Sequence, residues 1–248
     1  MAYGHALVTG ALGGLGSAMV RRLLADGYAV VACDRRAELA DDWLKNIPAE
    51  QRERVAFHPL DVTKEDQVNE LARMLKDQGV HIAYLANNAG VNGAGAVWAL
   101  ESRVWEIVLR VNLHGTFYMT RAFSAAMKER GFGRIVNLAS LYAYHPGEAE
   151  APYAAAKAGI AGYTRSTARD LAPHGVTVNV LAPGLIWHEG LRGVFPDETW
   201  EKMRKNIPVG RTGRPEEIAA TVAFLFSDEA AFITGQTIHV NGGEYLPG

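Results

Sequence analysis

The 248-residue sequence contains only one cysteine, Cys33. A single cysteine excludes a disulfide within the chain and any zinc site built from several cysteines. We expect Cys33 itself to be a small buried side chain at the end of a strand. The eight histidines are scattered, and the HEG tripeptide at 188–190 lacks the second histidine of a zinc-protease helix. The sequence therefore predicts no metal site.

The sequence also lacks an excess of one charge. Lysine and arginine together number 25, against 27 aspartates and glutamates, so no overall field would attract nucleic acid or an acidic membrane surface. No uninterrupted apolar run reaches the ~18 residues that a membrane-spanning helix requires. The first residues, MAYGHALVTG, show neither a basic segment nor an apolar segment ahead of a cleavage site. We expect a cytoplasmic protein that binds neither nucleic acid nor membrane.

No linker, low-complexity run or internal repeat interrupts the chain, and we expect a single domain over residues 1–248. Short apolar runs alternate with longer amphipathic runs, which is typical of βαβ units in an α/β protein with a parallel sheet. The predicted strands, expected to be buried on both faces, are 5–9, 29–34, 55–60, 82–88, 134–140, 176–182 and 236–240. Thr63 is predicted to cap a helix that stops at Gly79, and Pro215 to begin the last helix.

Residues 184–213 interrupt this alternation. The segment lies between a predicted strand and the last predicted helix, is longer than an ordinary connection, and is more polar than its neighbours. Connections of this length in a compact domain are often lids or binding loops. We interpret the segment as a substrate lid, and the alternative is an excursion without a role in binding.

Glycines crowd the turn between the first predicted strand and the first helix, where the chain reads TGALGGLGSAM. They are Gly10, Gly13, Gly14 and Gly16. Glycines here allow a sharp turn and let a pyrophosphate approach the helix N-terminus, where free N–H groups and the helix dipole favour an anion. Asp34 ends the next strand, where a dinucleotide fold places the carboxylate that binds the adenosine ribose. The pattern predicts a dinucleotide site, and a tight turn without a ligand is the alternative.

Further motifs follow along the chain in a fixed order. The glycine motif is T-G-x-x-x-G-x-G from Thr9, followed by NNAG at 87–90, VNLHGTF around Asn112, IVNLAS ending at Ser140, YAAAK from Tyr153, and NVLAPGLI at 179–186. In order and spacing, the chain resembles the short-chain dehydrogenase/reductase family over nearly its whole length. The resemblance implies a Rossmann-type doubly wound parallel sheet of seven strands with helices on both faces.

Tyr153 and Lys157 lie four residues apart in a run made almost entirely of alanine and glycine. Residues at this spacing are neighbours on one face of a helix. An adjacent ammonium favours the phenolate, so Lys157 is expected to lower the pKa of Tyr153 and make it a base for the oxidation of an alcohol. A chance pair on a solvated face is the alternative.

The resemblance assigns catalytic roles to four residues. It implies that Tyr153 passes the proton and that Lys157 also binds the nicotinamide ribose. It further implies that Ser140 hydrogen-bonds the substrate oxygen and that Asn112 holds a water connecting Lys157 to solvent. From the residues alone, Ser140 could equally cap a loop, and Asn112 could satisfy the backbone of a kinked helix.

Charge at the end of the second strand bears on the choice of cofactor. Asp34 can accept from a ribose 2′-hydroxyl and would repel the 2′-phosphate of NADP, which favours NAD. Arg35 and Arg36 are the counter-argument, since an arginine just after this strand can pair with that phosphate. By resemblance, the cofactor-binding residues are Gly10, Gly13, Gly14, Leu15, Gly16, Asp34, Arg35, Asp61, Val62, Asn88, Ala89, Gly90, Tyr153, Lys157, Pro183, Gly184 and Ile186. Asp61 could instead cap the next helix.

The substrate pocket is expected between the segment after Ser140 and residues 184–213, because both flank the catalytic tyrosine. The predicted substrate-binding residues are Tyr142, His145, Trp187 and His188. Tyr142, His145 and Trp187, together with Tyr144, Glu148 and Glu150, make this neighbourhood aromatic and polar. Such a set favours a small polar or cyclic alcohol, such as a sugar or polyol, over a long acyl chain. His188 stands where the family commonly has a threonine that contacts the carboxamide or phosphates. It could replace that contact, point into the substrate pocket or lie in a surface loop.

Three functions remain open from the sequence. The first is an NAD-dependent oxidation of a secondary alcohol or reduction of the ketone. The second is an NADPH-dependent 3-oxoacyl thioester reductase, which Asp34 opposes. The third is a non-catalytic dinucleotide-binding regulator, which the complete set of catalytic residue types opposes. By resemblance we expect a homotetramer paired through the helices that carry Asn112 and Tyr153, and the small residues from Ala154 to Gly162 would permit close helix approach.

Overall fold

The structure is a computed structural model that describes residues 3–191 and 196–247. In this part of the chain seven strands form one sheet in the order β3-β2-β1-β4-β5-β6-β7, and every neighbouring pair is parallel. The strands are β1 (His5–Thr9), β2 (Val30–Asp34), β3 (Val55–Pro59), β4 (Ile82–Asn87), β5 (Gly133–Leu138), β6 (Val176–Pro183) and β7 (Thr237–Val240). The predicted fold class is confirmed, and the predicted strand ends differ from the observed ones by no more than two residues.

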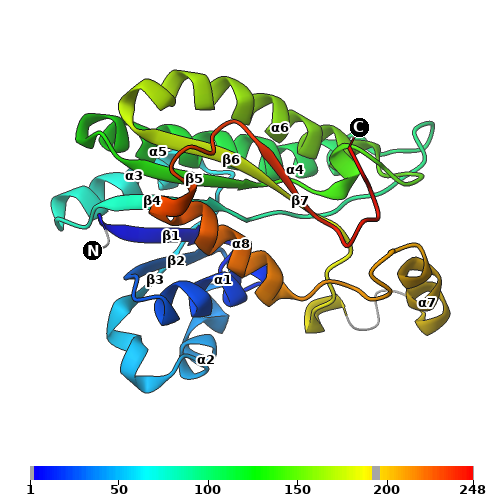
Figure 1. The fold of residues 1–248 in the computed structure, drawn as a ribbon, viewed down its shortest axis with the longest axis horizontal. Coiled ribbons are helices and arrows are strands. Elements are labelled where there is room, and N and C mark those ends of the chain that lie inside the picture. The colour runs from blue at the N-terminus through cyan, green and yellow to red at the C-terminus, as the bar shows by residue number, and fades with distance from the viewer. Residues whose placement is uncertain (1–2, 192–195, 248) are drawn as a thin grey trace.

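Helices cover both faces of the sheet (Figure 1). On one face lie α1 (Gly14–Ala25), α2 (Ala40–Lys45) and α8 (Pro215–Phe226). On the other lie α3 (Glu65–Asp77), α4 (Ser102–Leu109), α5 (Gly115–Arg130) and α6 (Ala151–Leu171). The remaining helix, α7 (Asp197–Lys205), projects from one end of this three-layered body (Figure 1).

Two large hydrophobic clusters, one on each face, and a smaller third one hold the helices to the sheet. Val8 of β1 packs with Leu23 of α1 in the first cluster. The next residue back, Leu7, packs with Leu75 of α3 and Met119 of α5 in the second. Successive side chains of a strand point to opposite faces, so an apolar run without alternation fills both clusters at once. Cys33 is also buried and free, as expected, and burial raises the pKa of its thiol.

The edge strands depart from the expectation of full burial. β3 and β7 contain no fully buried residue, whereas β2, β4, β5 and β6 are buried throughout. An edge strand lacks a neighbour on one side, and its side chains are less completely covered by the flanking helices. The prediction that every strand is buried on both faces is therefore wrong for these two.

The start of α3 also differs from its prediction. Lys64 precedes the helix as its cap residue, without a capping side-chain hydrogen bond. Thr63 instead donates both its N–H (2.9 Å) and its hydroxyl (2.7 Å) to the Asp61 carboxylate. The two polar residues satisfy each other in the turn before the helix, so neither Thr63 nor Asp61 caps it. By contrast, α8 does begin at Pro215, as the sequence predicts.

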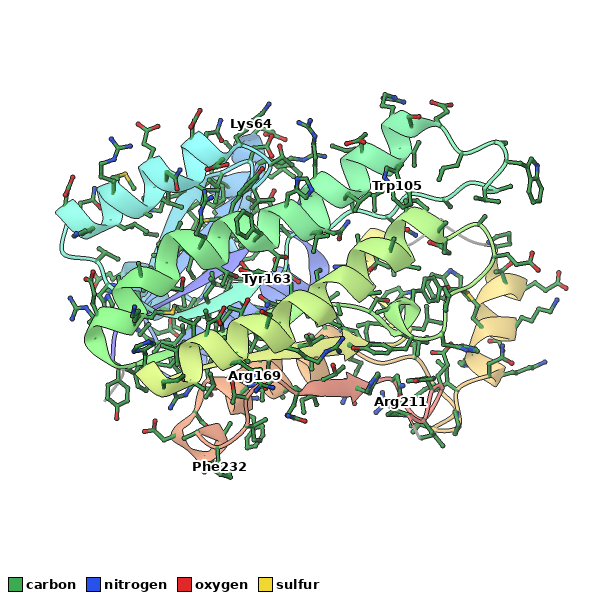
Figure 2. The ribbon with its side chains drawn as sticks, turned by 90° about the horizontal axis from the view of Figure 1, so that it is seen from above. Lys64, Trp105, Tyr163, Arg169, Arg211 and Phe232 are labelled. Atoms are coloured by element: carbon green, nitrogen blue, oxygen red, sulfur yellow. The ribbon has the colours of Figure 1, made fainter. Side chains whose placement is uncertain are left out.

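A long helical rod positions two of the predicted catalytic residues. α4 runs through a π-helical turn, Arg110–His114, directly into α5, and this rod lies beside α6 (Figure 2). Tyr163 of α6 lies between the two, with its ring edge-on to that of Phe117 at 6.1 Å (Figure 2). No helix within the described ranges combines the length and apolarity needed to cross a membrane.

The order of the strands creates a crevice beside β1. From β1 the chain first builds outward through β2 and β3, then crosses back to place β4 on the other side of β1. Connections on either side of such a point leave in opposite directions, and ligands bind there, at the carboxyl ends of the strands. The glycine turn after β1 and the NNAG motif after β4 both lie at this point.

The predicted lid segment leaves the sheet after β6. Ile186 and Gly213 pair in an isolated parallel bridge, so the two ends of the excursion are held together. Between them lie a short 3-10 helix, Glu189–Leu191, and α7. Residues 192–195 of the predicted lid lie outside the described residues.

Candidate active site

A cavity of about 680 Å³ opens at the carboxyl ends of the central strands. Every residue that the resemblance assigns to the cofactor lines it: Gly10, Gly13, Gly14, Leu15, Gly16, Asp34, Arg35, Asp61, Val62, Asn88, Ala89, Gly90, Tyr153, Lys157, Pro183, Gly184 and Ile186. The carboxyl ends of β1 to β6 and the start of α6 contribute to the cavity lining. The fold thus gathers motifs that are scattered along the sequence around one cavity.

The glycine turn has the geometry of an anion cradle. Gly10 has a φ of +64°, and a Cβ there would lie 2.9 Å from Cα of Ala89. Gly13 precedes α1 without a capping side chain, and the first turn of α1 carries no acidic residue. The first N–H groups of α1 therefore remain available at the cavity, where the helix dipole favours a negative charge. These residues fit the pyrophosphate of a dinucleotide.

A hydrogen-bond network joins this turn to the segment after β4. The hydroxyl of Thr9 accepts from the N–H groups of Asn88 and Ala89, both at 3.0 Å. In return, the Asn88 side-chain amide donates to the carbonyls of Thr9 (2.9 Å) and Gly10 (3.2 Å). Thr9 and Asn88 thereby hold the two loops at the crevice in a fixed relation.

Asp34 is engaged by the protein itself at the end of β2. Its carboxylate accepts from Nε and Nη2 of Arg36, both at 3.0 Å, and from the N–H of Leu12 at 3.1 Å. Burial opposes ionisation of Asp34, but these hydrogen bonds prevail and hold its pKa below the ordinary value. Arg36 and the exposed Arg35 both line the cavity beside it. The pair leaves Arg36 neutralised, and Arg35 has no such partner among the described hydrogen bonds.

The tyrosine and lysine of α6 lie at the inner part of the cavity. The Nζ of Lys157 is 5.5 Å from the centre of the Tyr153 ring and donates to the carbonyl of Leu138 at 2.7 Å. Ser140 hydrogen-bonds the Tyr153 side chain, while its own oxygen accepts from the N–H of Tyr142 at 3.2 Å. Ser140 therefore caps a short 3-10 helix, Leu141–Ala143, and faces the phenol as well.

Burial controls the protonation of this pair. It raises the pKa of Tyr153 to about 12, and the hydrogen bond with Ser140 only partly opposes that rise. It also lowers the pKa of Lys157 to about 7. Lys157 is not among the groups that shift Tyr153. Burial thus outweighs the ammonium in this structure, and the lowering expected from Lys157 together with an oxidised nicotinamide stays a prediction.

Asn112 lies behind the lysine, in the π-helical turn. Its amide nitrogen donates to the carbonyls of Val91 (2.8 Å) and Val108 (2.9 Å), while its Oδ1 is buried without a hydrogen-bond partner. A Cβ on Gly90 would lie 2.7 Å from this oxygen and 3.4 Å from Nζ of Lys157. Only a glycine leaves room between them. Asn112 does not line the cavity, but its orphaned oxygen faces the same glycine as the lysine.

The predicted substrate residues divide into two pairs. Tyr142 and His188 line the cavity. His145 does not; its ring stacks on that of Tyr245 at 6.3 Å. Trp187 does not either, and it is 41% exposed. Of the four predicted substrate residues, the structure thus brings only Tyr142 and His188 to this cavity.

His188 lies against the glycine turn. A Cβ on Gly14 would be 2.5 Å from Cγ of the imidazole, so the ring covers the start of α1. Its Nδ1 is buried without a hydrogen-bond partner, and burial lowers the pKa of the ring. His188 therefore lies at the end of the cavity formed by the glycine turn, where a cofactor phosphate is expected to bind.

Several lining residues were not predicted. They include Asn92, Trp200, Met203 and Glu244. Arg36, expected as a possible partner of a 2′-phosphate, and Glu150, expected in the wall of the substrate pocket, also line the cavity. Trp200 and Met203 come from α7, and Glu244 follows β7. No sequence motif indicates Trp200, Met203 or Glu244, because only the three-dimensional packing brings the lid and the C-terminal segment to the cavity.

Comparison with known proteins agrees with the geometry. A family model described as Enoyl-(Acyl carrier protein) reductase matches residues 10–244. The chain is 40% identical to an acetoacetyl-CoA reductase of Shinella zoogloeoides over 242 residues, covering 97% of this chain and 98% of the relative. It is 34% identical to a 3-oxoacyl-(acyl-carrier-protein) reductase of Haemophilus influenzae over 241 residues, with the same coverage.

A solved structure is similar throughout. It comes from Agrobacterium tumefaciens, from a protein assigned as a gluconate dehydrogenase, with a TM-score of 0.92 and 30% identity over 98% of this chain and 96% of that one. With these matches, the chain belongs to the short-chain dehydrogenase/reductase family. It is an NAD(P)-dependent oxidoreductase of the ketoreductase and dehydrogenase type.

Proposed function

We propose that this protein transfers a hydride between NAD(H) and a secondary alcohol or its ketone, and that the substrate is small and polar or cyclic, such as a sugar or polyol. The observation that carries the proposal is the grouping of Ser140, Tyr153 and Lys157 at one end of a cavity whose other end is a glycine turn suited to a pyrophosphate. A scaffold without chemistry has no need of a buried base, which argues against a non-catalytic regulator.

In the proposed reaction, Tyr153 takes the proton from the alcohol oxygen while Ser140 hydrogen-bonds that oxygen. An oxidised nicotinamide bound here would supply the hydride acceptor and a positive charge beside the phenol. That charge is needed, because burial alone holds the pKa of Tyr153 at about 12. Lys157 donates to the ribose hydroxyls and, once hydrogen-bonded there, is favoured in its charged form. Asn112 would hold a water through its unpartnered oxygen and so connect Lys157 to solvent.

The proposed cofactor is NAD. Asp34 stands at the ribose end of the cavity with a carboxylate held ionised, and a 2′-phosphate there would meet its negative charge. Arg36 does not offset this repulsion while it is paired with Asp34. Arg35 supplies the counter-argument, since it is exposed at the same edge.

A second candidate is reduction of a 3-oxoacyl thioester with NADPH. The relatives named above support it, because two of them act on acetoacetyl-CoA or on 3-oxoacyl groups of an acyl carrier protein. Tyr142 and Glu150 near Tyr153 favour a polar substrate and so support the first candidate, whereas Leu141, Leu191 and Met203 in the same lining are compatible with an acyl chain.

The excursion between β6 and α8 is proposed to act as a lid. Trp200 and Met203 on α7 line the cavity, while their helix projects from the body of the protein (Figure 1). Closure of such a segment would remove water from the reacting groups. A homotetramer paired through α4, α5 and α6 is also proposed, on the resemblance alone.

The proposal is tested by steady-state rates. Purified protein is offered sugars, polyols and cyclic alcohols with NAD and with NADP, and 3-oxoacyl thioesters with NADH and NADPH, with the nicotinamide absorbance as readout. We expect turnover of a member of the first group, with NAD preferred. Turnover confined to the thioesters would replace the first candidate with the second.

A further inference from the structure

Two glutamates stand in the cavity wall near the reacting phenol. Glu150 immediately precedes α6 and Glu244 follows β7, and both line the cavity. Each carboxylate has one protein donor: the side-chain amide of Asn92 for Glu150 and the N–H of Leu185 for Glu244. The Oε2 atom of each is buried and has no hydrogen-bond partner among the described residues.

Both carboxylates lie close enough to Tyr142 to influence it. Both interact electrostatically with its hydroxyl, and Glu150 also acts on Tyr153. The rings of Tyr142 and Tyr153 meet edge to face at 6.3 Å. Oε2 of Glu244 lies beside the cavity-lining Gly184, since a Cβ there would be 3.2 Å from it. Glu150, Glu244 and Tyr153 thus line one and the same cavity.

A buried carboxylate oxygen without a donor is costly, and proteins rarely keep one without a reason. Burial raises the pKa of both glutamates, which is the expected sign of this cost. A ligand that brings O–H donors would remove the cost. An aliphatic chain would leave it in place, and a ligand carboxylate or phosphate would add repulsion.

We propose that Glu150 and Glu244 are specificity-determining residues that bind hydroxyl groups on either side of the reacting carbon, so that the substrate is a neutral polyhydroxylated compound. The inference rests on the proposed function, because it requires Tyr153 to hold the reacting oxygen. It narrows that function: a sugar or polyol is selected, whereas a sugar acid and an acyl thioester are rejected.

The first test uses the wild-type protein and changes the substrate. Rates with NAD are measured for a polyol that is turned over, for its analogues lacking one hydroxyl next to the reacting carbon, and for the corresponding sugar acid. We expect kcat/KM to fall about tenfold or more for each missing hydroxyl, because each loses a charge-assisted hydrogen bond. The sugar acid should also be poorer than the neutral polyol.

The second test changes the glutamates. Glu150→Gln and Glu244→Gln keep the side-chain shape and remove the charge, and Glu148→Gln, an exposed neighbour outside the cavity lining, is the matched control. We expect each cavity variant to lose about tenfold or more in kcat/KM for the polyol, mainly through KM, and little for the analogue that lacks the hydroxyl it binds. In the same variants, kcat/KM for the sugar acid should come closer to kcat/KM for the polyol. The Glu148→Gln control should have the wild-type values.

The possible failures are distinguishable. If no sugar, polyol or cyclic alcohol reacts with either cofactor, whether or not a 3-oxoacyl thioester does, the first candidate function fails and this inference fails with it. If alcohols are oxidised but missing hydroxyls cost nothing, or if the sugar acid is preferred, the proposed function stands and the glutamate assignment is overturned. Should a glutamine variant not fold, as judged by thermal unfolding, the substrate series in the wild-type protein decides alone.

Discussion

The amino group of Lys157 lies 5.5 Å from the centre of the Tyr153 ring, on a helix face built otherwise from small residues. Burial moves the two groups in opposite directions, the pKa of the lysine down to about 7 and that of the tyrosine up to about 12. Both changes favour the neutral forms. Burial alone therefore does not favour the phenolate of Tyr153 or the ammonium of Lys157. We expect the positive charge of the bound cofactor to favour the phenolate.

Replacement of Lys157 should change the pH dependence of stability. The ordinary lysine pKa is 10.5, and that of Lys157 is about 7. Between these values the unfolded chain holds a proton that the folded chain has released, so the stability contribution of this residue rises with pH. Below about pH 7 the folded protein bears the full cost of a buried ammonium. Lys157→Met should raise the thermal midpoint of the ligand-free protein more at about pH 6 than at about pH 9.

The control for this comparison is Lys128→Met, which removes an exposed lysine near the end of α5. It should shift the midpoint similarly at both pH values. A Lys157→Met effect that is equally large at both pH values would mean that this lysine remains charged in the folded protein, against the account.

Removal of Asp34 should alter cofactor preference. Asp34→Ser releases Arg36 from its two hydrogen bonds and removes the charge that repels a 2′-phosphate. Since a charge-assisted contact is gained and a repulsion lost, we expect the ratio of dissociation constants, NADPH to NADH, to fall about tenfold or more. Fluorescence titration measures both constants. Asp41→Ser, the same charge change on α2, is the control, and an equal response in both variants would contradict the assignment.

Gly14 and His188 should be coupled. Alanine suits the first turn of α1, where it is worth up to ~1 kcal/mol over glycine, but its Cβ would meet the imidazole of His188 at 2.5 Å. Gly14→Ala should therefore lower the thermal midpoint and weaken dinucleotide binding. Adding His188→Ala should restore the midpoint, whereas binding stays weak because the Cβ still obstructs the pyrophosphate. Strictly additive effects on the midpoint would exclude the contact.

The sheet was predictable because its strands are short apolar runs, and the residues of the inner strands are buried on both faces. The run HALVT before the glycine turn, for example, is short and mainly apolar, which indicates a buried strand. Burial at the edges was not predictable in the same way, since position in the sheet depends on the strand order. Thr63 shows a second limit. Its residue type suits a helix cap, but its side chain hydrogen-bonds Asp61, two residues earlier in the chain, instead of the helix.

The cavity, too, was predictable only in part. Tyr153, Lys157 and the glycine turn stand in spaced motifs, and the structure gathers them around one space. Glu244 has no motif and reaches the cavity only because the chain after β7 folds back over the end of β6. The protonation of the site was the least predictable. The pKa of Tyr153 depends on its burial, and the adjacent residues in the sequence do not indicate how deeply it is buried.

The most direct test of the account is Tyr153→Phe, assayed for both turnover and binding. The variant keeps the ring and removes the group that exchanges the proton, which is worth roughly a hundredfold or more in rate. We predict that kcat falls by at least about that factor, while the dissociation constant for NADH, measured by fluorescence, stays close to the wild-type value. Undiminished kcat in this variant would contradict the assignment of Tyr153 as the proton-transferring residue.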